Sequence, residues 1–142
     1  MKTQINGKAW GFRSLSWWLT LLPAAGIIFV GIRFMIAPTI GADGFGIPFS
    51  NADDTVFGKI KGIRDAFSGL VLLPLLWMGM RKATAWVFTA AIIVPFTDCM
   101  LVIATNGSGD WSHWLIHGGT ALYMAFTSIL LFKSPEVKVQ GS

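Results

Sequence analysis

The sequence has few charged residues and a single cysteine. Only 13% of its 142 residues are charged and 54% are hydrophobic, whereas about 25% charged residues is usual for a soluble domain. This deficit excludes an ordinary soluble globular domain and indicates a protein that lies in a lipid bilayer. Because Cys99 is the one cysteine, no disulfide forms within the chain, and the redox compartment stays undetermined.

Nucleic acid is excluded as a partner by the way the positive charge is spread. The net charge of +4 comes from 11 Lys and Arg residues scattered among apolar runs, with no basic patch and no nucleic-acid-binding motif. The two histidines and the scattered aspartates lack the ligand spacing of a metal site. The sequence therefore predicts no metal and no cofactor.

Four apolar stretches are long enough to cross a bilayer, which takes about 20 helical residues. They cover residues 15–37, 62–80, 83–104 and 113–132 and use almost the whole chain. The first is too long for the apolar core of a cleavable signal peptide, so it is interpreted as a retained helix. The predicted fold is all-α: one membrane domain, residues 1–142, that forms an integral membrane four-helix bundle.

The residues that flank the spans predict the orientation, because Lys and Arg are retained on the cytoplasmic side. Basic residues precede the first span, join the second to the third and follow the fourth: Lys2, Lys8, Arg13, Arg81, Lys82, Lys133 and Lys138. Four crossings place all of these on one side. Both termini are therefore predicted to be cytoplasmic, and a bacterial inner membrane is expected.

Ionisable residues inside the spans predict the site, because such residues are costly in lipid and usually face a bundle interior or a wet cavity. Each span carries ionisable residues at a similar depth in the outer half of the membrane. They are Arg33, the adjacent Arg64 and Asp65, Asp98, and His117. Asp65 shares a helix face with Gly62 and Gly69, and small residues let helices approach closely in lipid. We therefore expect an internal cluster of charges.

The residue types suggest roles within this cluster. Asp98 and Asp65 are candidate bases or nucleophiles, and His117 is a candidate proton shuttle. Three residues are candidate ligand-binding groups: Arg33, Arg64 and His113.

Structural roles stay open for the same residues. Arg64 and Asp65 are also suited to capping the second helix, and Arg33 to reaching the outer surface with its long side chain. Asp98 is alternatively a member of a structural ion pair, and His117 a packed histidine bonded to a backbone carbonyl. For His113 an interfacial position is an alternative to ligand binding.

Residues 38–61 form a long connection, and long connections in compact proteins are often lids or binding loops. Four apolar residues in it are suited to covering an opening: Phe45, Ile47, Pro48 and Phe49. Two alternatives stay open, namely a loop that rests on lipid headgroups and, from about Asp53, an amphipathic lead-in to the second span.

Four short motifs stand out along the chain: FGIP at 45–48, KGIRD at 61–65, Asp98 in the third span, and HGG at 117–119. Over about residues 20–132 this set resembles an uncharacterised family of small four-span membrane proteins, which is loosely similar to the DoxX-like membrane proteins. The resemblance implies a four-helix membrane fold and brings no established activity with it.

Three classes of function follow from the predicted cluster. We favour a membrane protein that binds or transforms a small lipophilic molecule, by isomerisation or epoxide opening, in a dry site. The second class is an oligomeric transport or binding component, since four helices are few for a pore. The third is a non-catalytic assembly subunit whose charges fix helix packing, and a homo-oligomer is the expected form in the last two classes.

Overall fold

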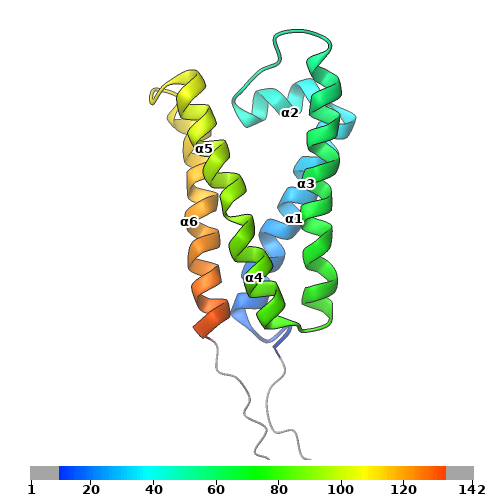
Figure 1. The fold of residues 1–142 in the computed structure, drawn as a ribbon, viewed down its shortest axis with the longest axis vertical. Helices are drawn as coiled ribbons and strands as arrows, with labels where there is room; N and C mark the ends of the chain where they lie inside the picture. The colour runs from blue at the N-terminus through cyan, green and yellow to red at the C-terminus, as the bar shows by residue number, and fades with distance from the viewer. Residues whose placement is uncertain (1–9, 134–142) are drawn as a thin grey trace, which may run out of the picture.

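All regular structure in the described part of the chain is helical (Figure 1). The computed structural model describes residues 10–133. Its helices are α1 (Leu15–Ile36), α2 (Pro38–Phe45), α3 (Asp54–Trp77), α4 (Arg81–Ala91), α5 (Ile93–Asn106) and α6 (Trp111–Lys133). The all-α prediction is confirmed over these residues. Lys2, Lys8 and Lys138, which contributed to the predicted orientation, lie outside them.

The predicted second span is part of a longer helix. α3 begins at Asp54 rather than at residue 62, and side-chain hydrogen bonds connect its first residue to the segment before it. Asp54 Oδ2 accepts hydrogen bonds from the backbone N–H groups of Ser50 and Asn51, at 3.0 and 3.1 Å, and Asn51 Oδ1 accepts one from the backbone N–H of Asp54. A reciprocal arrangement of this kind satisfies free N–H groups at a helix start. The alternative in which the chain from about Asp53 leads into the second span therefore describes this segment correctly.

The predicted third span is divided into α4 and α5. The break falls at Ile92, because Pro95 has no N–H to offer the carbonyl of Ala91 and its ring clashes with that carbonyl.

A second departure from prediction is α2, where a loop was expected. Pro38 occupies its first turn, and Gly46 ends it with φ 98°, a left-handed conformation that favours glycine.

The helices pack as two antiparallel pairs, α1 with α3 and α5 with α6 (Figure 1). The first pair is in close contact through glycines. Gly31 faces Gly62 and Ala66, and a Cβ at Gly31 would lie 2.5 Å from the Ala66 backbone nitrogen and from the Gly62 carbonyl oxygen. One helix backbone therefore lies directly on the other, the contact that small residues permit in lipid.

Both pairs are joined at the end of the molecule where residues 10 and 133 lie, which we call the terminal end (Figure 1). The Tyr123 hydroxyl of α6 donates to the Leu19 carbonyl of α1 at 2.9 Å, and within the first pair Trp17 Nε1 donates to the Leu76 carbonyl at 3.1 Å. A buried core connects α1, α3, α4 and α6: Ala24, Leu72, Ala85, Phe88, Met124 and Leu131. At the opposite end, the α2 end, α2 lies between the two pairs.

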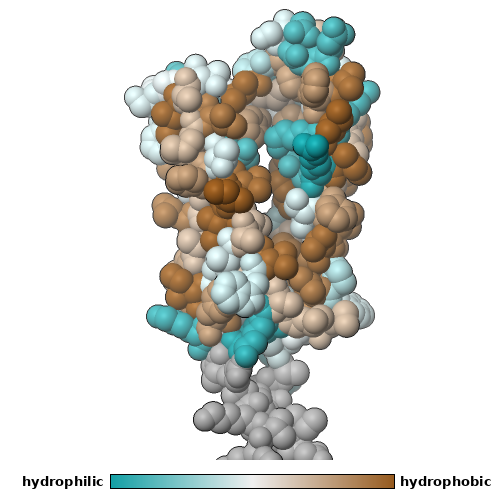
Figure 2. All heavy atoms as spheres, in the orientation of Figure 1, coloured by the Kyte–Doolittle hydropathy of each residue, from teal (hydrophilic) through white to brown (hydrophobic). Residues whose placement is uncertain are grey.

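The outer surface of the helices is strongly apolar (Figure 2). Large exposed side chains include Leu22, Phe29, Leu122 and Phe126, a surface that soluble proteins avoid. Three helical stretches among the described residues are long and apolar enough to span a membrane: Leu15–Ile36, Arg81–Asn106 and Trp111–Lys133. Their length and composition indicate a membrane protein.

Gly31→Ala is expected to lower the melting temperature, because the new Cβ meets the backbone of α3, which cannot move aside. Adding a methyl group to so tight a contact costs ~1–3 kcal/mol. Gly26→Ala on the same helix is the matched control, since its Cβ meets nothing within 4 Å. Thermal unfolding in detergent measures both variants, and equal melting temperatures would argue against the backbone contact.

Candidate functional site

Lys61 and Asp65 form an ion pair on the face of α3 that is turned toward α2. Lys61 Nζ lies 2.5 Å from Asp65 Oδ2, one helical turn away. It also lies 4.8 and 4.9 Å from the ring centres of Phe34 and Phe45. Asp65 is only 7% exposed. The pair and the two rings together make a buried charge tolerable, because the carboxylate and the π faces replace the water that the ammonium has lost.

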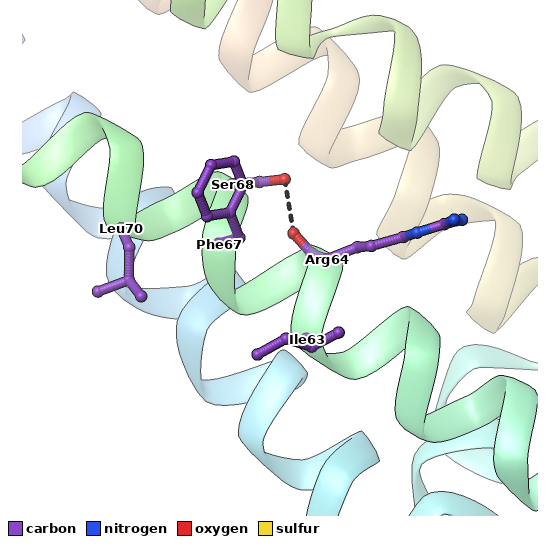
Figure 3. Close-up of a pocket in the computed structure, with 5 residues that line it drawn as sticks. All are labelled: Ile63, Arg64, Phe67, Ser68 and Leu70. Atoms are coloured by element: carbon purple, nitrogen blue, oxygen red, sulfur yellow. Dashed lines mark hydrogen bonds between the residues drawn. The ribbon is translucent and has the colours of Figure 1, made fainter.

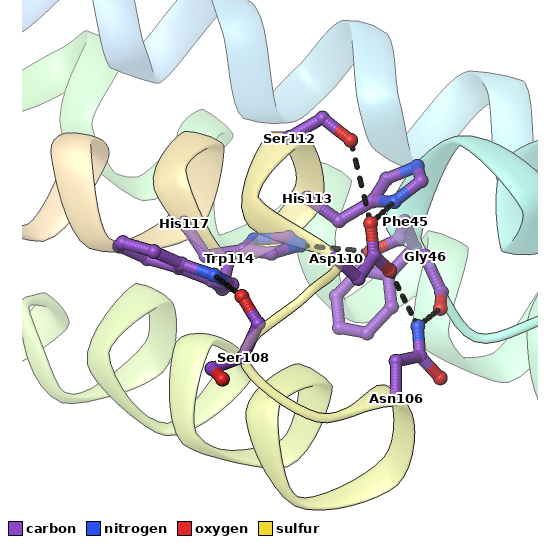
Figure 4. A network of polar contacts seen from close by, with 9 residues as sticks. All are labelled: Phe45, Gly46, Asn106, Ser108, Asp110, Ser112, His113, Trp114 and His117. Atoms are coloured by element: carbon purple, nitrogen blue, oxygen red, sulfur yellow. Dashed lines mark hydrogen bonds and ion pairs between the residues drawn. The ribbon is translucent and has the colours of Figure 1, made fainter.

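His117 reaches the same place from α6 (Figure 4). Its Nε2 lies 3.0 Å from the carbonyl oxygen of Phe45, and its ring centre lies 4.5 Å from that of Phe45. A carbonyl oxygen only accepts hydrogen bonds, so Nε2 carries the hydrogen and donates it. In neutral His117 the other nitrogen, Nδ1, is therefore an unprotonated acceptor, and no hydrogen bond engages it within residues 10–133.

Asp98 approaches from α5 and is half-buried. It lies close enough to Lys61, His117 and Asp65 to interact with each electrostatically. Within residues 10–133 its carboxylate makes no hydrogen bond and no ion pair shorter than 4.0 Å. Asp98 thus lies within electrostatic range of Asp65 and His117, two of the candidate site residues, and of Lys61. We call these four side chains the polar cluster.

Arg64 is not a member of the polar cluster, and the expectation that it belongs to the internal charges is wrong. Its side chain is exposed and extends from α3 beside an open, largely apolar trough (Figure 3) lined by Ile63, Arg64, Phe67, Ser68 and Leu70. Adjacent residues point about 100° apart on a helix, whereas residues four apart share a face. Asp65 therefore pairs with Lys61 and not with its neighbour in sequence.

Arg33 also lies outside the polar cluster, contrary to the prediction. It is exposed at the end of α1, and its Nη2 donates a hydrogen bond to the Ile40 carbonyl of α2 at 3.1 Å. The long side chain reaches out past the apolar segment, as the alternative for this residue described. Arg33 therefore braces α2 against α1.

His113 belongs to a separate network at the turn between α5 and α6 (Figure 4). Its Nδ1 lies 2.7 Å from Asp110 Oδ1. Asn106 Nδ2 donates to Asp110 Oδ2 at 2.6 Å and to the Gly46 carbonyl at 2.5 Å. Hydrogen bonds from Asn106 and then from His113 lower the pKa of the Asp110 carboxyl. The network ties the end of α2 to the α5–α6 turn.

α2 covers the polar cluster through Phe45. The Phe45 ring touches Lys61 and His117, and its carbonyl accepts the His117 hydrogen bond. Gly46 is needed at the next position, because its φ is 98° and a Cβ there would lie 2.7 Å from the His113 side chain. Phe49, the other aromatic residue of the predicted lid, packs instead against Gly58 of α3.

Lys61 is the residue that the sequence analysis missed. It is the last residue of the expected 38–61 connection, because the start of the second span was placed at residue 62. The signal that identifies it is its spacing from Asp65, since oppositely charged residues four apart meet on a helix. Among residues 10–133 no group of three His, Cys, Asp or Glu side chains is placed to hold a metal ion.

The chain belongs to an uncharacterised family. Residues 24–131 match the family described as a domain of unknown function, DUF4267. This range contains all four residues of the polar cluster and α2. No curated protein and no solved structure matches the chain.

Lys61→Met should lower the melting temperature, because it leaves Asp65 buried and without its cation. Breaking a buried pair costs ~3–5 kcal/mol, and less where water reaches it, as at the 31% exposed Lys61 side chain. The matched control, Arg64→Met, removes an exposed charge and is expected to change little. Adding Asp65→Asn to Lys61→Met should recover part of the loss. A larger effect in Arg64→Met would overturn this assignment of partners.

Proposed function

We propose that this protein spans the membrane four times and binds a small lipophilic molecule at the polar cluster, where Asp98 and His117 carry out acid–base chemistry on it. The proposal has two parts, the topology and the site. The architecture is supported by the arrangement of α3, and the site by the unpartnered carboxylate of Asp98.

The course of the chain supports α3 as a fourth span. α1 leads from the terminal end to the α2 end, and α4 begins again at the terminal end, where Arg81 Nη1 donates to the Leu131 carbonyl. The chain must return between them. α3 does so in direct contact with α1 from Gly62, opposite Gly31, to Leu76, opposite Trp17.

Charge supports a cytoplasmic terminal end. The described basic residues there are Arg13, Arg81, Lys82 and Lys133, whereas the α2 end carries Asp43, Asp53, Asp54 and Asp110, partly offset by Lys59 and Lys61. Lys and Arg are retained on the cytoplasmic side. The polar cluster then lies in the outer half of the bundle, in a membrane such as the bacterial inner membrane.

The unpartnered Asp98 is the observation that carries the functional part. A carboxylate within an apolar helix is costly in lipid and persists where it is paired or used. The neighbouring cation, Lys61, is already held by Asp65 at 2.5 Å. Asp98 is therefore a carboxylate available to a ligand, next to a histidine whose Nδ1 is also free.

This pair suits proton transfer in a site of low polarity. His117 Nδ1 is positioned to accept a proton, and its Nε2 bond to Phe45 fixes the ring and the tautomer. Asp98 is available to accept a proton or to stabilise the imidazolium that forms. Lys61 supplies a positive charge beside any negative charge that develops on the ligand. An isomerisation, in which a proton is removed from one atom and returned to another, uses these groups without a further reactant.

The packed core supports a binding site rather than a channel. Between the polar cluster and the terminal end the bundle is filled by Ala24, Leu72, Phe88 and Met124, all buried. The surface is hollowed instead between α5 and α3 near the α2 end, with hydrophilic atoms on the α3 side (Figure 2). A lipophilic molecule then enters sideways from the membrane and does not cross it.

Asp98→Asn is expected to abolish ligand binding while folding is retained, because it keeps the side-chain shape and relieves an unpaired charge. Native mass spectrometry and lipid extraction of purified wild type should show a co-purifying small molecule that the variant lacks. The melting temperature of the variant should be equal or higher without ligand. Unfolding of Asp98→Asn would instead make Asp98 structural, and identical extracts would remove the support for a ligand.

Cysteine labelling tests the topology. In a Cys99→Ala background, a cysteine at the exposed Lys82 should react only from the cytoplasmic side. Cysteines at the exposed Asn51 and Ser108 should react only from the opposite side, using a reagent that does not cross membranes. Labelling of positions 51 and 82 from the same side would mean that α3 does not span.

A further inference from the structure

Arg64 is a cation on the outward-facing surface of α3, a helix that the proposed topology places in the membrane. Its side chain is exposed, and within residues 10–133 its guanidinium makes no hydrogen bond and no ion pair. Arginine keeps its positive charge in proteins. Such a charge is costly in lipid unless it has a partner or reaches the membrane surface. The partner of Arg64 therefore has to come from outside the described chain.

The position of Arg64 along α3 fits the headgroup region of the outer leaflet. Gly62 of α3 lies opposite Gly31 of α1, and α1 ends five residues after Gly31, at Ile36. The backbone of Arg64 is therefore ~10 Å below the level where α1 ends, at ~1.5 Å per residue. Its side chain points toward the α2 end and away from Leu70 (Figure 3). An arginine in this position brings its charge to the headgroups while its stem stays in hydrocarbon.

The trough beside Arg64 is suited to a hydrocarbon chain. It has a volume of about 510 Å³. Its apolar wall consists of Ile63, Phe67 and Leu70, which share one face of α3 and are each more than half exposed. The hydroxyl of Ser68, which also lines the trough, donates to the Arg64 carbonyl at 2.9 Å. Among the described residues, Arg64 is thus the only charged side chain of the trough.

We propose that the trough binds an anionic phospholipid of the outer leaflet, with its phosphate at Arg64 and an acyl chain along the apolar wall. Arginine binds phosphate through two parallel N–H···O hydrogen bonds. From Arg64 to Leu70 the trough extends ~9 Å along the helix axis, within the ~15 Å of hydrocarbon that one leaflet provides. The inference rests on the proposed topology of α3 and does not involve the polar cluster.

Charge favours an anionic lipid over other occupants. A zwitterionic lipid carries an ammonium beside its phosphate and leaves the charge of Arg64 unbalanced, whereas an anionic headgroup neutralises it. A free phosphate ion leaves the apolar wall uncovered. A second copy of the chain, related by a two-fold axis through this face, would bring two Arg64 side chains together. No acidic side chain from the described part of the chain lines the trough to offset that repulsion.

Native mass spectrometry tests the site with delipidated protein in detergent, titrated with phosphatidylglycerol or phosphatidylcholine of identical acyl chains. Arg64→Gln removes the charge, and its control is Lys59→Gln, which removes another exposed cation of α3 that lies outside the trough. Phe67→Ala truncates the apolar wall, and its control is Phe57→Ala, an exposed phenylalanine of α3 outside the trough. Glycerol 3-phosphate, which has the phosphate and no acyl chain, is added as a competitor.

Wild type should bind phosphatidylglycerol about tenfold more tightly than phosphatidylcholine, and Arg64→Gln should remove this preference. Phe67→Ala should weaken both lipids about fivefold, while both control variants bind as wild type does. An unchanged preference in Arg64→Gln would refute the site. Equal losses in Arg64→Gln and Lys59→Gln would also refute it, because they would show a general attraction of anions to basic residues. Competition by glycerol 3-phosphate would identify a site for a soluble anion and not for a lipid.

The proposed function is decided by separate measurements. If cysteine labelling shows that α3 spans and Arg64→Gln keeps the preference for phosphatidylglycerol, only the lipid assignment is wrong. If α3 does not span, the lipid assignment fails together with the topology. Asp98→Asn should keep the preference while it loses the molecule bound at the polar cluster. Loss of the preference in Asp98→Asn would place the lipid at the polar cluster and contradict its assignment to the trough.

Discussion

The contact between α1 and α3 is the constraint on which the rest of the bundle depends. Because Gly31 lies against the backbone of α3 at Gly62 and Ala66, the two helices form one closely packed unit. Small residues fill the centre of their shared face, and the first turns of α3 lie beside the end of α1. Lys61 and Asp65 are placed in this way beside Phe34 of α1 and near the other helix pair.

Charge burial in lipid explains why α2 is needed. An ammonium and two carboxylates between apolar helices require partners and shielding from the bilayer. Phe45 of α2 contributes a ring to Lys61, a ring contact to His117 and a carbonyl to His117 Nε2. α2 is fixed on both sides, by Arg33 of α1 and by Asn106 of α5. The short helix thus joins two halves that are otherwise held together mainly at the terminal end.

Two side chains of the polar cluster are paired with each other and the other two are not. The proposed acid–base chemistry rests on this difference. Lys61 and Asp65 satisfy each other, whereas Asp98 and the Nδ1 of His117 have no partner within residues 10–133. A structural ion-pair network would be expected to use its carboxylates fully. The proposed acid–base chemistry rests on these two acceptors beside a held cation.

The sequence by itself determined the all-α class, the membrane composition, the positions of α1 and α6, and the choice of Asp65, Asp98 and His117. These follow from local properties: apolar length, and the cost of ionisable groups in lipid. The helical spacing of Lys61 and Asp65 was also present in the sequence, although the late start assigned to the second span concealed it. The exposure of Arg33 and Arg64 and the separate network of His113 were decided only by tertiary structure. Each depends on which surface of one helix meets another, and side-chain direction across such contacts is set by packing between segments distant in sequence, which no local pattern contains.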